Sequence, residues 1–331
     1  MATQVMRLAT SVVWLLLGAT AALAQDLDPR AYAHIPVNST FLVSGFAVSH
    51  GGVVNDPTLP DFDVDATVET PSVGVGHSFS RLGRTAQAFG AMPYSWVQGR
   101  ARGETRVTRA GVGDMRVRLS VLVRGAPATS VSEFAKAPRR TILGTSLTVV
   151  APTGQYFPDK LLNVGTNRWA FKPELGISQP IRQRWLLDAY AALWLFGAND
   201  SYFPGTTVVT QAPMGAFQVH LSYNFRPQLW TALDATCYVG GRATKQGVSD
   251  DHMQSNSRVG GTLVLPVGRR HSVKLAASRG DIRYGPDFGT FSIGWQRPGS
   301  SAAHPPSGNH TAEGGNSSST HGRRWGDPLE A

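Results

Sequence analysis

His220, Ser222 and Asn224 recur at every second position of one stretch, so an extended strand would place their side chains on one face. A serine becomes a nucleophile when a histidine base lies within hydrogen-bond reach, and this row is therefore the sharpest candidate for catalysis. The opposite face of the stretch is apolar, from Phe217 to Phe225. The polar row would thus turn away from lipid. We expect a row of hydrogen-bonded side chains and no enzyme, with lipid hydrolysis by His220 and Ser222 as a remote alternative.

Charged residues stand in several other stretches that alternate between apolar and polar positions. Charged side chains that line a pore select solutes by charge. Paired charges in the same places would instead form a ladder that fills the interior. Both interpretations stay open for the candidate selectivity residues Arg116, Arg118, Lys172, Glu174, Asp188, His220, Asp234, Arg258 and Lys274.

Twelve alternating stretches position these candidates, and each is a predicted β-strand. A strand of about ten residues crosses a bilayer when it is tilted. The predicted strands are residues 40–49, 67–79, 85–96, 114–123, 141–151, 169–178, 185–196, 215–225, 229–239, 257–265, 272–278 and 288–295.

The gaps between these strands alternate in length. Residues 80–84, 179–184, 226–228 and 266–271 are short gaps, whereas residues 50–66, 152–168, 197–214 and 240–256 are long ones. Short turns on one side and long loops on the other are typical of bacterial outer-membrane barrels. The gap 124–140 is long where a turn is expected, and its Val131, Phe134 and Ala135 at helical spacing predict a short periplasmic helix.

The sequence therefore predicts an all-β fold, a monomeric, antiparallel, up-and-down transmembrane β-barrel of about 12 strands at residues 40–295. Ten or fourteen strands are possible, because the second strand alternates poorly around Pro71. A lipid-facing Arg at mid-bilayer costs about 2–4 kcal/mol, so Arg116 and Arg118 must face a polar lumen. A soluble β-sandwich would also alternate, but its loops would not sort by length so regularly.

Residues 1–24 predict a cleavable export signal for the bacterial outer membrane, because Arg7 precedes an apolar run at 12–17 and the small-residue site Ala22-Leu23-Ala24. No later run of about 18 apolar residues predicts a transmembrane helix. The formal net charge of +9 could serve a basic pore or an anionic lipopolysaccharide surface. Lys and Arg do not cluster with stacking aromatics, so we expect no nucleic-acid binding.

The two ends of the chain differ from the barrel. Residues 25–39 are predicted to form an extended N-terminal segment, and residues 296–331 a disordered tail rich in Gly, Ser, Pro and His. The tail residues His304, His310 and His321 lack the spacing of metal ligands. We expect no cofactor and no metal site.

The densest motif is PTGQYFPDKLLNVGTNRWAFKPE, which runs from Pro152 to Glu174. Shorter motifs are DLDPRAY from Asp26, GVGD from Gly111, LSYNFRP from Leu221 and YVGGR from Tyr238. On these residues the chain resembles the outer-membrane family named for the meta-pathway of phenol degradation, whose members are described as transporters. The resemblance covers about residues 26–295. It implies a barrel and, through the name of the family, a link to uptake of aromatic compounds. We also expect the barrel-assembly machinery as a partner of the barrel.

Polar and aromatic residues of the long motif gather near the predicted outer rim. Tyr156, Asn163, Asn167, Arg168 and Trp169 are candidates for gripping a planar apolar solute through ring surface and a few polar anchors. The same residues could instead fold the loop onto itself within the interface belt, which favours aromatic side chains. The next strand contains a proline at position 173, which predicts a bulge or kink.

The leading functional expectation is passive uptake or binding of small, aromatic or hydrophobic solutes across the outer membrane. The barrel would act as a monomer in contact with lipid and lipopolysaccharide. The alternative is a sealed scaffold barrel of the envelope, with its interior plugged by the N-terminal segment and filled by paired charges.

Overall fold

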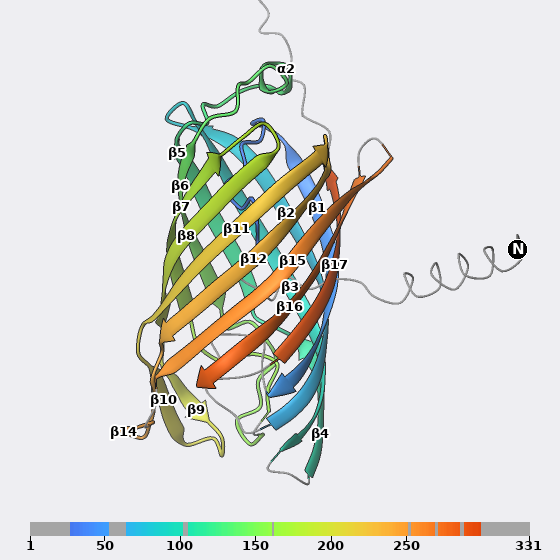
Figure 1. Cartoon of the computed structure of the whole chain (residues 1–331). Helices are drawn as coiled ribbons and strands as arrows, with labels where there is room; N and C mark the ends of the chain where they lie inside the picture. Colours follow the sequence, from blue (N-terminus) through green and yellow to red (C-terminus); the bar gives the residue numbers. More distant parts are fainter. Residues whose placement is uncertain are drawn as a thin grey trace, which may run out of the picture. The chain divides into compact units, whose positions relative to one another are not determined.

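Twelve antiparallel strands close into a barrel in the computed structural model, which describes residues 27–52, 64–101, 105–160, 162–250, 253–268, 271–284 and 288–298 (Figure 1). The first strand pairs with the last, Phe41 opposite Pro298, so the wall has no edge. The strands are β1 (Thr40–Gly52), β2 (Val64–Arg81), β3 (Arg84–Ala101), β4 (Thr105–Val112) with β5 (Met115–Arg124), β6 (Ile142–Ala151), β7 (Ala170–Pro180), β8 (Trp185–Phe196), β11 (Met214–Arg226), β12 (Leu229–Gly240), β15 (Gln254–Val267), β16 (His271–Tyr284) and β17 (Phe288–Pro298).

β4 and β5 both pair with β3, so they form one wall strand that is interrupted at Gly113 and Asp114. With this strand counted once, all twelve predicted strands are confirmed. The fourth prediction is too short at its start, because the hairpin of β3 and β4 extends to Thr105.

Prolines interrupt the ladder where the sequence indicated irregularity. Pro71 lies opposite Phe46 of β1, but the register with β3 passes from Glu69 directly to Ser72. The register of β7 with β8 likewise omits Lys172 and Pro173. Proline has no N–H to donate, so one side of each strand loses a ladder bond.

The short connections that follow β2, β7, β11 and β15 lie at one end of the barrel, with the helix α2 (Val131–Phe134) beside them (Figure 1). The Ser130 side chain caps α2, and Glu133 completes a capping box by bonding back to the Ser130 backbone. This helix confirms the prediction for the gap 124–140.

The long connections that follow β6, β8 and β12 lie at the opposite end (Figure 1). Those after β8 and β12 form a second, small sheet. Its strands are β9 (Asn199–Tyr202), β10 (Thr207–Gln211), β13 (Ala243–Lys245) and β14 (Val248–Ser249). This sheet joins two loops that the sequence predicted only as loops.

The outward face of the barrel is apolar. Leu233 is 71% exposed, Leu175 67% and Val259 63%, all on mid-strand positions that alternate with buried polar residues. Trp169 and Phe171 stack near the loop end, whereas Trp185 and Tyr223 pack together near the turn end. An apolar band between two aromatic girdles is the surface of a membrane-spanning barrel. The unpaired Cys237 lies on this exposed face.

Among the described residues, no helix is long and apolar enough to cross a membrane. The predicted export signal lies outside the described residues, as do residues 299–331 of the predicted tail with His304, His310 and His321. The prediction placed the start of the tail too early, because residues 296–298 pair with β1 as the end of β17.

Candidate functional site

On the wall formed by β5 to β8, β11, β12 and β15, the inner face of the barrel carries many buried charged residues and, toward the long loops, a buried apolar cluster around Trp194 and Met214. Arg118 lies on this inner face with the buried residues Lys172, Glu174, Asp188, His220, Asp234 and Arg258. The alternation of each strand places these side chains inward and the apolar ones outward. The predicted lumen position of these residues follows from the register, and their role in selectivity stays a prediction.

One group of charges centres on Glu174. Arg118 Nη2 lies 2.9 Å from Glu174 Oε1, and Lys172 Nζ lies 3.3 Å from Oε2. Two cations thus neutralise a carboxylate that is removed from water, which buried charges require. Arg116 shares the inward face with Arg118, two positions along β5.

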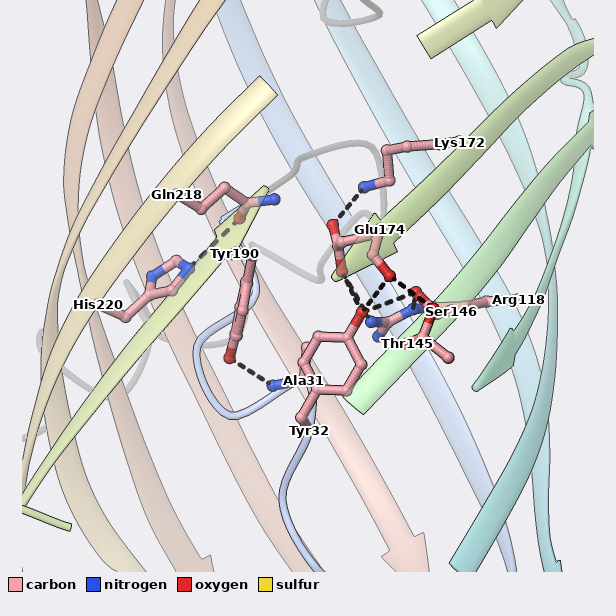
Figure 2. A network of polar contacts seen from close by, with 10 residues as sticks. All are labelled: Ala31, Tyr32, Arg118, Thr145, Ser146, Lys172, Glu174, Tyr190, Gln218 and His220. Carbon is pink, nitrogen blue, oxygen red and sulfur yellow. Dashed lines mark hydrogen bonds and ion pairs between the residues drawn. The ribbon is translucent and has the colours of Figure 1, made fainter. Parts of the chain in front are cut away.

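A second group centres on Asp234. His220 Nδ1 lies 2.7 Å from Asp234 Oδ1, and the Thr262 hydroxyl donates to Oδ2 at 2.6 Å. The other ring nitrogen of His220 faces Gln218 Oε1 at 3.3 Å (Figure 2). A histidine and a hydroxyl group therefore bind the Asp234 carboxylate in the described part of the barrel.

The remote catalytic alternative does not match this geometry. Both ring nitrogens of His220 are engaged, by Asp234 and by Gln218. The buried Ser222 Oγ has no hydrogen-bond partner among the described residues. The bond from a serine nucleophile to its base is therefore not formed.

The N-terminal segment enters the lumen of the barrel. It was predicted to be extended, but it turns back at Arg30, whose φ is 66°, and the Ala33 N–H donates to the Arg30 carbonyl. Asp28 pairs with Lys274 at 2.7 Å. The Arg30 N–H donates to Asp188 Oδ2 at 3.2 Å, and its guanidinium lies over the Trp230 ring. We call residues 27–33 the plug.

Tyr32 is the anchor of the plug and is fully buried. Its hydroxyl lies 2.9 Å from Ser146 Oγ and 3.0 Å from Glu174 Oε1 (Figure 2). The ring rests on Gly144 and Gly176, where an added Cβ would lie 2.2 Å from ring atoms. Only glycine leaves room for this approach.

Two further contacts hold the plug. The Ala31 N–H donates to the Tyr190 hydroxyl at 3.1 Å, and the Tyr190 ring meets the Tyr32 ring edge-on at 5.2 Å (Figure 2). His34 then leads the chain out beneath α2, where its Nε2 lies 3.0 Å from the Pro127 carbonyl and its ring contacts Phe134. The plug therefore occupies the part of the lumen nearest the short turns.

The opposite inner wall, formed by β1 to β3, carries one pair of stacked aromatic rings. Phe41 of β1 and Phe89 of β3 stack with centroids 6.0 Å apart and planes at 9°. Both rings lie over glycines of β2, since a Cβ on Gly76 would meet Phe41 at 2.1 Å and one on Gly74 would meet Phe89 at 2.7 Å. Both rings stay partly exposed. The inner face of β1 to β3 thus presents a partly exposed apolar surface beside buried hydroxyls such as those of Thr70 and Ser95, which bond each other.

The loop candidates do not converge on one point. Asn163 folds its own loop, bonding Phe157 and Lys160 through backbone groups. Arg168 is buried and donates to Gln211 Oε1 at 2.6 Å, whereas Trp169 is half exposed on the outer face.

Tyr156 and Asn167 share one partner. Asn199 donates to the Tyr156 hydroxyl at 2.9 Å and accepts from Asn167 Nδ2 at 2.9 Å. Burial raises the pKa of Tyr156, which keeps the phenol neutral. These contacts fit the loop-folding interpretation, and solute binding by the five loop residues stays a prediction.

Asp114 has a role that the sequence reasoning missed. Its carboxylate accepts from the Gly154 N–H at 2.8 Å, the Thr166 N–H at 2.8 Å and the Thr166 hydroxyl at 2.6 Å. It thereby clamps the motif loop, residues 152–168, to the break between β4 and β5. The GVGD motif was the available signal, because a carboxylate after two glycines ends a strand more often than it continues one.

Among the described residues, no group of three or more His, Cys, Asp or Glu side chains could hold a metal ion.

Comparison with known proteins decides the family. The model of the family described as the MetA-pathway of phenol degradation matches residues 44–288. The chain belongs to this family. No curated protein matches the sequence significantly.

The fold is also that of a solved barrel. The COG4313 outer membrane channel from Pseudomonas putida F1 is 19% identical, with a TM-score of 0.72 over 82% of this chain and 100% of that chain. The beta domain of the Bordetella autotransporter BrkA, at 13% identity and a TM-score of 0.46, covers 78% of this chain and 98% of its own. The second score is too low to inform function.

Proposed function

We propose that this family member is an outer-membrane channel through which small apolar or aromatic solutes cross passively. The observation that carries the proposal is the stacked, partly exposed pair of Phe41 and Phe89 on the inner face. The charged groups around Glu174, Asp188 and Asp234 on the opposite wall are occupied by one another, by neighbouring hydroxyls and by the plug. An apolar solute needs no hydrogen-bond partner, so these two rings suit an apolar solute better than a sugar or an ion.

Weak, non-directional contact is what passage requires. Burial of apolar surface contributes about 25 cal/mol per Å², so a single small ring gains only modest affinity from two phenyl faces. Binding of that strength favours entry without preventing exit. The link of the family name to phenol degradation agrees with this class of solute.

The plug gives the channel a closed state. Its contacts with Glu174, Asp188 and Tyr190 occupy the turn-side part of the lumen. Passage through that part requires the plug to shift. The same contacts favour the second candidate, a permanently sealed scaffold barrel.

Solute flux separates the two candidates. Refolded protein in liposomes should let toluene or phenol in faster than protein-free liposomes do, and the double variant Phe41→Ala/Phe89→Ala should reduce that rate. Phe217→Ala is the matched control, because Phe217 is 54% exposed on the lipid-facing side. A rate equal to that of protein-free liposomes, both for the native chain and for a variant with a weakened plug, would establish the sealed barrel instead.

A further inference from the structure

Positive charge gathers at the short-turn end of the barrel. Across the connections described at this end, Glu133 is the only acidic residue, and it bonds to Ser130. Arg139, Arg182, Arg184 and Arg226 are exposed there, and none of them forms an ion pair with another described residue. Part of the net charge of the chain therefore has no partner within the described barrel.

Contacts between three connections place these four arginines at neighbouring positions of the barrel end. Arg139 follows α2 and donates to the Gln183 carbonyl of the turn between β7 and β8. The carbonyl of Arg184 accepts from the Asn224 N–H at 2.8 Å and from Asn224 Nδ2 at 2.9 Å. This contact joins the turn to the end of β11, where Arg226 lies. We call these four residues the basic rim patch.

An aromatic cluster fixes the depth of the patch in the membrane. Trp185 and Tyr223 lie 4.9 Å apart, and Tyr223 meets Phe225 edge-on at 5.1 Å. Arg184 Nη1 donates to the Tyr223 hydroxyl at 3.2 Å, so the patch is bonded directly to the cluster. Trp and Tyr side chains gather at the level of lipid headgroups. The Arg184 guanidinium beside them, and the connections that carry the other three arginines, therefore lie at the level where headgroup phosphates are found.

We propose that the basic rim patch binds the phosphate headgroups of anionic phospholipid, such as phosphatidylglycerol, in the leaflet beside the short turns. The planar guanidinium offers paired N–H donors that match two oxygens of a phosphate. The neighbouring rings provide apolar surface for the acyl chains of the same molecule. A soluble acidic partner would use the charges but not the rings, and the lipid is therefore the better occupant.

Lipid counting tests the proposal. The refolded full chain in phosphatidylcholine bicelles is titrated with phosphatidylglycerol, and bound lipid is measured by native mass spectrometry. Each basic residue near an anionic surface contributes about a factor of five to binding. Arg182→Gln/Arg226→Gln should therefore weaken phosphatidylglycerol binding by roughly 30-fold.

The matched control removes the same charge from the other end. Arg106 and Arg242 are exposed near the long loops, and Arg106→Gln/Arg242→Gln should leave binding within twofold of the native chain. Equal loss in both double variants would mean attraction by net charge alone and would overturn the proposal. Binding of soluble glycerol phosphate as tight as that of the lipid would overturn the assignment to lipid. A change in gel mobility on boiling confirms that each variant is folded, because a closed barrel resists detergent until it is heated.

Discussion

Replacing Tyr32 with alanine should release the plug and leave the ring of barrel strands intact. The ring is fully buried on Gly144 and Gly176, and its hydroxyl bonds Ser146 and Glu174. The barrel strands do not depend on it, because every wall strand pairs with two others. The substitution therefore acts on the docking of the segment and not on the fold.

The size of the effect follows from what the side chain loses. Truncating a buried aromatic ring to alanine costs about 3–5 kcal/mol. Each 1.36 kcal/mol is a factor of ten, so the ratio of docked to released plug should fall by roughly two to four orders of magnitude. Tyr32→Phe keeps the ring and loses only the hydroxyl bonds, about 0.5–1.5 kcal/mol each. It should give a smaller fall.

Single-channel recording in planar bilayers measures the outcome. Tyr32→Ala should open more often and for longer than the native chain, and Tyr32→Phe should lie between them. Tyr223→Ala is the control, because it removes a tyrosine from the outer face, where the Tyr223 ring packs against Trp185. A folded Tyr32→Ala protein with the native open probability would refute the idea that Tyr32 holds the plug.

Further predictions concern the seat of the plug, the motif loop and pH. Gly176→Ala should open the channel as Tyr32→Ala does, because the added Cβ would lie 2.2 Å from the Tyr32 ring. Gly289→Ala is the control and should keep the native open probability, because a Cβ there would have no neighbour nearer than 3.9 Å. Asp114→Asn should weaken the clamp by about 1.5–3 kcal/mol, the usual contribution of hydrogen bonds to a charged group, and limited proteolysis should cut the motif loop faster than in the native chain. Burial lowers the pKa of His34. Docking therefore favours the neutral imidazole, and His34 stabilises the docked segment above its ordinary pKa of about 6.5. That contribution is lost as the pH falls and the imidazole is protonated. An open probability that does not rise between pH 7.5 and pH 5 would contradict this.

The sequence predicted the wall better than the contents of the lumen. The bounds 185–196 coincide with β8, because unbroken alternation over a whole strand carries its own register. The loop strands β9, β10, β13 and β14 were missed, since each has two to five residues and a partner in another connection or across a turn. Strands that short leave no periodic pattern.

The anchor of the plug lay beyond sequence reasoning for a related reason. Tyr32 and Glu174 are 142 residues apart, and no local spacing connects them. The inward position of Glu174 could be derived from alternation, but its contact with Tyr32 could not. The motif that contains Tyr32 indicated the family without indicating what the tyrosine contacts.

The pairing of β1 with β17 also determines how the protein can form. Ser49 and Thr290, whose hydroxyls lie 2.8 Å apart, are separated by 241 residues. Contacts of such long sequence separation form late and slow the folding of β-rich chains. Until they form, the sheet carries two open edges that can pair with other chains. A chain cut anywhere before β17 would keep both edges, so the last strand decides between a finished barrel and an aggregate.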